Sequence, residues 1–168
     1  MPTNLEIKAK YPSLAKARKI SRDLGARFGG TLKQTDTYFK VKQGRLKLRE
    51  INKKELELIY YRRGDSKGNR YSDYTVLPLQ RKEAAKRVLE SLFETLVVVR
   101  KRRELFLYKN SRIHIDTVAG LGAFVEFEVL VVRGERQAQD LMSSLRREFG
   151  INSASLIGGS YSDMLLKR

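Results

Sequence analysis

The stretch Arg45-Leu46-Lys47-Leu48-Arg49-Glu50 alternates cationic and apolar side chains. Successive side chains of a strand point to opposite faces, so Arg45, Lys47 and Arg49 share one face and the two leucines share the other. Three cations on one face repel one another unless an anion lies beside them. The stretch therefore predicts a strand with one face in an apolar core and the other face toward an anion.

Three further segments, 5–8, 112–116 and 125–129, alternate apolar and charged residues in the same way. In the last of them, Glu126 and Glu128 share one face and apolar residues occupy the other. Strands of this kind can close into a barrel with a polar interior and an outer surface covered by helices. A charged interior needs a ligand.

The pattern of the whole chain predicts a single domain over residues 1–168. Its class is α+β: about eight strands in antiparallel hairpins, closed into a β-barrel with a charged lumen and flanked by three or four helices. Ser160 and Asp163 have the spacing of a helix capping box. The polar loop 64–69 is a candidate lid. Strands are expected at 4–10, 31–41, 45–50, 56–63, 71–79, 97–108, 112–118 and 123–132, and helices at 13–24, 82–92, 135–149 and 160–166.

The composition excludes several classes of protein. The chain has no cysteine, which excludes disulfides, thiolate zinc sites and cysteine nucleophiles, and its one histidine excludes a multi-histidine metal centre. It contains no run of about eighteen apolar residues, and it opens on an alternating strand without the apolar core of a signal peptide. We therefore expect a cytoplasmic protein with no membrane partner.

The formal net charge of +16 indicates a polyanionic partner. Nucleic acid, an anionic membrane surface and a phosphate-rich small molecule all fit this charge. A solvated basic surface would explain much of the same excess. Total charge therefore decides little, and the arrangement of the charges carries the argument.

Candidate cations lie on two further predicted strands. Lys101 and Arg103 share one face of 97–108, although the contiguous run 100–103 also has the form of a basic tract for nuclear localisation or nonspecific nucleic-acid binding. We prefer the strand because apolar residues bracket the run. Arg62 ends the strand 56–63 and is a further candidate, with Arg63 on the opposite face.

Carboxylates spaced two apart on a strand can share a hard divalent cation, and oxygen ligands suit Mg²⁺ or Mn²⁺. Glu126 and Glu128 have this spacing, and their alternative role is simple ion pairing across the strands. For His114, a structural hydrogen bond is favoured over a role as general base. Tyr60, Tyr61 and Tyr74 are candidates for stacking a base or ring, although tyrosines in strands more often pack in a core.

The segment Asn4-Leu5-Glu6-Ile7-Lys8 resembles the E-x-E-x-K signature of the CYTH superfamily, the triphosphate tunnel metalloenzymes. The resemblance covers nearly the whole chain in the same order. Among the branches of the family, the chain is most similar to the class IV adenylyl cyclase-like group. The other segments that carry the resemblance are Asp36-Thr37-Tyr38-Phe39, Leu46-Lys47-Leu48-Arg49-Glu50, Lys101-x-Arg103, Ile113-His114-Ile115-Asp116, the stretch from Gly120-Leu121-Gly122 to Glu128, and Gly159-Ser160-Tyr161-Ser162-Asp163.

The resemblance implies an eight-stranded antiparallel barrel that forms a tunnel for a triphosphate. It also implies that the cationic side chains bind the phosphates and that the carboxylates bind the metal ion. The cations that would grip the triphosphate are Lys8, Arg49, Arg62, Lys101 and Arg103, with Arg45, Lys47, Arg112 and His114 as further substrate-binding candidates. The carboxylates that would hold Mg²⁺ or Mn²⁺ are Glu6, Asp116, Glu126 and Glu128.

The implied activity is conversion of ATP to cyclic AMP and pyrophosphate, as in class IV adenylyl cyclases. A triphosphatase acting on inorganic tripolyphosphate, thiamine triphosphate or a nucleotide is the alternative, and a non-catalytic polyphosphate-binding or nucleotide-binding module is a further one. Interior carboxylates opposite the cations disfavour nucleic acid as a specific partner. A homodimer is compatible with the sequence.

One position departs from the signature. Asn4 stands where the family has its first glutamate. An amide oxygen can still bind Mg²⁺, but one negative charge is lost, so we expect weaker metal binding or a weaker second metal site. Arg62 stands where many relatives have lysine, which keeps the charge and changes the geometry.

Overall fold

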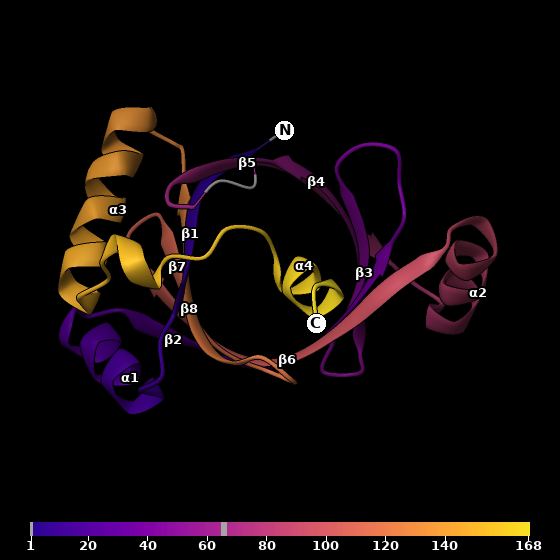
Figure 1. Ribbon diagram of the computed structural model, residues 1–168, viewed down its shortest axis with the longest axis horizontal. Helices are drawn as coiled ribbons and strands as arrows, with labels where there is room; N and C mark the ends of the chain where they lie inside the picture. The colour runs from indigo at the N-terminus through magenta and orange to yellow at the C-terminus, as the bar shows by residue number, and fades with distance from the viewer. Residues whose placement is uncertain (1, 65–66) are drawn as a thin grey trace.

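The computed structural model describes residues 2–64 and 67–168 (Figure 1). Eight antiparallel strands close into a barrel, as predicted, in the ring order β1-β5-β4-β3-β2-β6-β7-β8. The strands are β1 (Thr3–Lys10), β2 (Arg27–Phe39), β3 (Arg45–Ile51), β4 (Glu55–Arg63), β5 (Arg70–Leu79), β6 (Thr95–Tyr108), β7 (Ser111–Val118) and β8 (Gly122–Leu130). The candidate lid 64–69 includes residues 65–66, which lie outside the described part of the chain.

The helices are α1 (Leu14–Asp23), α2 (Lys82–Leu92), α3 (Glu135–Phe149) and α4 (Tyr161–Leu166), with a 3-10 turn at Ser153–Ser155. Figure 1 shows α1 and α3 outside the barrel on one side and α2 outside it on the other. Both α2 and α3 have the predicted bounds. None of the described helices has the length and the apolar run needed to cross a lipid bilayer.

The apolar core lies between the barrel wall and the outer helices. Leu5 and Ile7 of β1 pack in one buried cluster with Phe127 of β8 and with Met142 and Phe149 of α3. The rings of Phe127 and Phe149 meet edge to face at 4.8 Å. Because apolar burial outside the barrel supplies the main stabilisation, the lumen is free to be polar.

The strand 45–50 divides its faces as predicted. Leu46 and Leu48 point outward and pack with Leu89 of α2, whereas Lys47 and Arg49 line the lumen. Register between neighbouring strands then sets which charges meet across the lumen wall. Asp36 of β2 lies opposite Arg49, Glu126 of β8 lies between Lys8 of β1 and His114 of β7, and Glu6 lies opposite Glu128.

β2 begins at Arg27, four residues before the predicted start at 31. Its first residues pair with β6 across a register shift between Phe28 and Gly30. The sequence did not predict these first residues of β2 because glycine has a low strand propensity, and Gly29-Gly30 here marks a bulge.

Helix α4 begins within the ring of strands rather than outside it (Figure 1). The predicted capping box is present, since the Ser160 side chain accepts from the Asp163 backbone and the Asp163 side chain accepts from the Ser160 backbone. Ser160 and Tyr161 line the lumen, and Tyr161 packs with Tyr38 and Phe124. The C-terminal segment therefore closes part of the tunnel.

Candidate active site in the barrel lumen

The barrel encloses a cavity of about 410 Å³ lined mostly by charged and polar side chains. Lys47 and Arg49, the cations with which the sequence argument began, lie in its wall. Most of the other predicted site residues lie there too. The predicted residues that line the cavity are Glu6, Lys8, Lys47, Arg49, Lys101, Arg103, Arg112, His114, Glu126 and Glu128.

Three predicted residues lie elsewhere. Asp116 is fully buried behind the lining and binds Arg103. Arg45 pairs with Asp163 of α4 at 2.9 Å. Arg62 is exposed on the outside of the barrel, so its expected place in the lumen is wrong.

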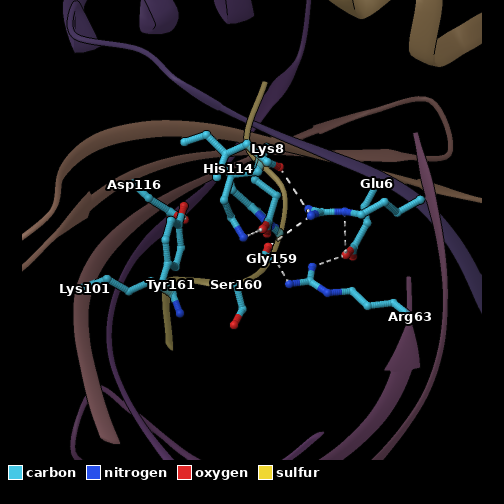
Figure 2. Close-up of polar contacts among 12 residues, drawn as sticks. Glu6, Lys8, Arg63, Lys101, His114, Asp116, Gly159, Ser160 and Tyr161 are labelled. Carbon is cyan, nitrogen blue, oxygen red and sulfur yellow. Dashed lines mark hydrogen bonds and ion pairs between the residues drawn. The ribbon is translucent and has the colours of Figure 1, made fainter. Parts of the chain in front are cut away.

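Arg63 takes the lumen position expected for Arg62. It forms an ion pair with Glu6 and donates to the carbonyl oxygen of Gly159 at 2.7 Å (Figure 2). The inward face of β4 carries Ile59 and Tyr61, which are apolar yet line the cavity. Strand alternation from these two residues places Arg63 inside and Arg62 outside.

Asp36 organises one group of lumen cations. Its carboxylate accepts two hydrogen bonds of 2.8 Å from Arg49, one of 3.0 Å from Lys101 and one of 3.2 Å from Lys47. Burial acts to raise the pKa of Asp36, but Arg49, Lys101 and Lys47 hold that pKa well below its usual range. Asp36 therefore stays ionised and fixes three cations toward the cavity.

Lys101 is the unusual member of this group. Burial lowers the pKa of its ammonium group to about 7, even though Asp36 lies beside it. Removing an ammonium group from water disfavours its charged form. Lys101 therefore changes charge near neutral pH.

Asp116 organises a second group. Arg103 donates to its two oxygens at 2.8 and 2.7 Å, and the Tyr161 hydroxyl donates to it at 2.7 Å. The Lys8 ammonium lies 4.1 Å from the centre of the Tyr161 ring, and Figure 2 shows Tyr161 beside Asp116. The C-terminal helix thus helps to hold Asp116 and Lys8 in place.

Glu126 lies at the centre of the β7–β8 side. It pairs with Lys8 at 2.9 Å and with Arg103 at 3.1 Å, and His114 Nδ1 lies 3.0 Å from it. Burial acts to raise the pKa of Glu126, but Lys8 and Arg103 hold that pKa well below its usual range. The hydrogen-bonding position of His114 agrees with the structural role favoured for it.

The donor set on this side fits a hard divalent cation. Ligand atoms of His114, Glu126 and Glu128 lie within 4.8 Å of one another. Glu128 has a long contact of 3.5 Å with Arg112. Asn4 lines the same cavity, and its buried Oδ1 has no hydrogen-bond partner within the described part of the chain. Carboxylate and amide oxygens are the ligands that Mg²⁺ and Mn²⁺ prefer.

The lumen is nearly neutral as a whole. Seven cations line the cavity, and Arg70, buried beside Glu6, is an eighth. Four carboxylates line the cavity and two more bind the lining cations, which leaves an excess of two positive charges among these residues. Most of the formal net charge of +16 therefore lies elsewhere on the chain. The cations are Lys8, Lys47, Arg49, Arg63, Arg70, Lys101, Arg103 and Arg112, and the carboxylates are Glu6, Asp36, Glu57, Asp116, Glu126 and Glu128.

Sequence reasoning missed the site roles of Asp36, Arg63 and Tyr161. Asp36 and Tyr161 stand within the family-like motifs, but their positions alone do not show which cations they contact. The alternation of β4 could have found Arg63 if Ile59 and Tyr61 had been read as lumen residues. Tyr74 lines the cavity, whereas Tyr60 packs outside the barrel beneath α2.

An eight-stranded antiparallel barrel with cations and carboxylates facing each other across its lumen is the triphosphate tunnel type of fold. The model of the CYTH domain family matches residues 2–161. The chain therefore belongs to the CYTH domain family. No curated protein sequence matches it significantly.

Solved structures with the same fold share little sequence with this chain. A protein from Pyrococcus horikoshii is 22% identical, with a TM-score of 0.85 over 95% of this chain and 98% of that one. A candidate adenylate cyclase from Vibrio parahaemolyticus is 18% identical, with a TM-score of 0.78 over 96% and 97%. A candidate adenylyl cyclase from Hippeastrum with a dominant triphosphatase activity is 14% identical, with a TM-score of 0.69 over 99% and 95%.

Proposed function

We propose that the protein is a metal-dependent enzyme that holds a triphosphate in the barrel lumen and breaks one of its phosphoanhydride bonds. The observation that supports this most directly is the convergence of Lys47, Arg49 and Lys101 on the buried Asp36. Enzymes that transfer phosphoryl groups work mainly by positioning the reacting groups and by stabilising the negative charge of the transition state. Cations held in fixed places contribute to both effects.

The lumen side chains divide into two roles. Arg49, Lys101 and Arg103 would bind phosphate oxygens, and Asp36 and Asp116 keep these cations aligned without touching the substrate. Glu126, Glu128 and the Asn4 amide oxygen would hold Mg²⁺ or Mn²⁺, which supplies charge neutralisation at the phosphate oxygens. All contacts of Asp116 named above go to Arg103 and Tyr161, so a positioning role suits it better than direct metal binding.

For the reaction, we infer an adenylyl cyclase-type outcome. The ribose 3′-OH of ATP attacks the α-phosphorus and loses its proton to solvent. The bond from that phosphorus to the oxygen that bridges it to the β-phosphorus breaks, and pyrophosphate leaves with the displaced electron pair. Ile59 and Val76 are register partners that both line the cavity beside Tyr74, and they offer an apolar wall for a nucleobase. Inorganic tripolyphosphate would not need such a wall.

A triphosphatase is the second candidate. In that reaction water attacks the terminal phosphorus and the bond from that phosphorus to its bridging oxygen breaks. The diphosphate part leaves with the electron pair, a proton of the water is released to solvent, and the attacked phosphorus becomes orthophosphate. The Hippeastrum protein with the same fold has a dominant triphosphatase activity, which supports this outcome by analogy. The same cations would serve either reaction.

Product analysis distinguishes these candidates. Purified protein is given ATP or tripolyphosphate with Mg²⁺ or Mn²⁺, and cyclic AMP, pyrophosphate and orthophosphate are resolved. Cyclic AMP with pyrophosphate from ATP would support the cyclase. Orthophosphate without cyclic AMP, accompanied by ADP from ATP or by pyrophosphate from tripolyphosphate, would support the triphosphatase. Tight binding of triphosphate with no product would overturn the enzymatic proposal in favour of a binding module.

A further inference from the structure

The outer face of β2 and β6 carries a row of cations that the lumen does not use. Gln34, Lys101 and Arg103 point into the lumen, so strand alternation turns Arg100 and Arg102 outward. The basic run 100–103 is thus divided between two surfaces: its odd positions belong to the lumen and its even positions to the outside.

Lys33 of β2 is also outward and exposed, and it is the direct cross-strand neighbour of Arg102. The Arg102 side chain is 49% exposed. Like charges directly opposite each other in an antiparallel pair destabilise a sheet. The fold does not need this pair, since the apolar cores lie on either side of it, beneath α1 and α3 and beneath α2.

The row continues onto α1. Arg18 donates to Glu104 through two hydrogen bonds of 2.8 Å, and Arg102 donates to the same carboxylate at 2.6 Å. Glu104 fixes the two guanidinium groups and neutralises one charge. Figure 1 shows β6 running between α1 and α2. We call Arg18, Lys33, Arg100 and Arg102 the basic strip.

The β3–β4 turn lengthens the strip. Asn52 accepts a hydrogen bond from the Lys33 backbone at 2.9 Å and donates one back at 2.8 Å. This contact brings the exposed turn residues Lys53 and Lys54 beside Lys33. Because the lumen residues counted above hold an excess of only two positive charges, cations such as these account for most of the basic character of the protein.

An exposed aromatic ring lies along the same outer face. Phe28 is 54% exposed, and its ring centre is 5.2 Å from that of Phe106. Phe106 shares the outward face of β6 with Arg102, four residues away, which is roughly 13 Å along a strand. A row of cations beside an exposed aromatic ring can bind single-stranded nucleic acid through phosphate contacts and base stacking.

We propose that the basic strip and Phe28 form a binding site for single-stranded nucleic acid. Lys33, Arg100 and Arg102 contact phosphates, and a base stacks on Phe28. The site lies outside the barrel and stands independently of the reaction proposed for the lumen. A polyphosphate chain would use the same cations but would leave Phe28 without a role.

The test measures fluorescence anisotropy of a labelled single-stranded RNA 12-mer with a 5′-hydroxyl, over a series of salt concentrations. With three phosphate contacts, log K is expected to fall against log salt with a slope of about −2. Removing two of these contacts in the Lys33→Gln/Arg102→Gln variant should make the slope shallower by about 1.4. The same variant is expected to bind RNA at least tenfold more weakly at low salt. Its matched control, Arg136→Gln/Arg147→Gln on the exposed face of α3, should stay within about twofold of the wild type.

Two further measurements separate the strip from other sites. Phe28→Ala is expected to weaken RNA binding about fivefold or more at an unchanged salt slope. Arg49→Gln, a change in the lumen, should leave the RNA affinity within about twofold of the wild type. Equal affinities of the strip variant and its control would overturn the proposal, as would a loss of RNA affinity in Arg49→Gln as large as that in the strip variant. Full retention of affinity in Phe28→Ala would also overturn it and indicate a site for phosphate chains. Circular dichroism melting of each variant shows whether it is folded.

Discussion

Asp36 and Arg49 lie opposite each other in the β2–β3 register and share two parallel hydrogen bonds of 2.8 Å inside the barrel. A guanidinium held in this way presents its remaining donors to the cavity at little entropic cost. We expect Arg49→Ala to weaken tripolyphosphate binding about tenfold to a hundredfold, since hydrogen bonds to charged groups contribute roughly 1.5–3 kcal/mol. Isothermal titration calorimetry measures the loss, and an affinity equal to the wild type would contradict a phosphate-binding role for Arg49.

Asp36 itself is predicted to matter for stability. Asp36→Asn leaves Lys47, Arg49 and Lys101 facing one another without a carboxylate, and breaking a buried ion pair in this way costs about 3–5 kcal/mol. Urea unfolding at pH 7 checks the value. Because the folded-state pKa of Asp36 is lowered, the difference from the wild type should shrink as the pH falls below its ordinary value of 3.8. A difference that persists unchanged at pH 2 would point to a cause other than charge.

We expect the affinity for tripolyphosphate to depend on pH through Lys101. Its pKa is lowered to about 7, so the ammonium form is lost as the pH rises through neutrality. The contribution of Lys101 to tripolyphosphate affinity should therefore decline between pH 6 and pH 8. Lys101→Arg is the control, because its side chain stays charged over this range. Tripolyphosphate titrates equally in both measurements, so the difference between the two pH profiles reports on Lys101 alone. Parallel pH profiles of the two proteins would exclude Lys101 as the titrating group.

The same shift affects folding in the opposite direction. Between about pH 7 and the ordinary lysine value of 10.5, the unfolded chain binds a proton at Lys101 that the folded chain does not. This group therefore contributes a free energy of unfolding that rises with pH across that window.

Glu126 is the carboxylate that tests the proposed metal site. We expect Glu126→Gln to lower Mn²⁺ affinity about tenfold or more, since it removes one charged oxygen ligand while preserving the side chain's shape. Electron paramagnetic resonance of free Mn²⁺ measures this without any substrate. The matched change Glu104→Gln, on the outer face, should leave Mn²⁺ binding intact. Equal Mn²⁺ affinity in both variants would remove Glu126 from the metal site.

Arg62 and Arg63 form a natural pair of experiments. Arg63→Ala removes the nearer of two cationic partners of Glu6, the other being Arg70 at 4.0 Å, whereas Arg62→Ala removes an exposed side chain. We expect Arg63→Ala to destabilise the fold by about 3–5 kcal/mol and to weaken triphosphate binding, and Arg62→Ala to change stability by less than about 0.5 kcal/mol. Thermal unfolding and calorimetry test both. The reverse order of effects would restore the sequence-based assignment of Arg62.

Much of the site could be predicted because a strand encodes its two faces locally. The alternation at 45–50, 5–8 and 125–129 correctly separates lumen residues from core residues. The alternation gave the wrong face on β4. Ile59 and Tyr61 are apolar but face the lumen, so on this strand an apolar side chain does not indicate the outer face of the barrel. The homodimer and the cytoplasmic location stay predictions.

By itself, the sequence determined the strands with charged faces, the helices at 82–92 and 135–149, and the capping box at Ser160. Only the tertiary structure decided which charges meet. Arg49 forms hydrogen bonds with Asp36, thirteen residues before it in the sequence, and Tyr161 forms one with Asp116, forty-five residues before it. The physical reason is that a face is set by the two-residue period of one strand, whereas a contact across the lumen depends on strand register and barrel closure, which many distant residues set together.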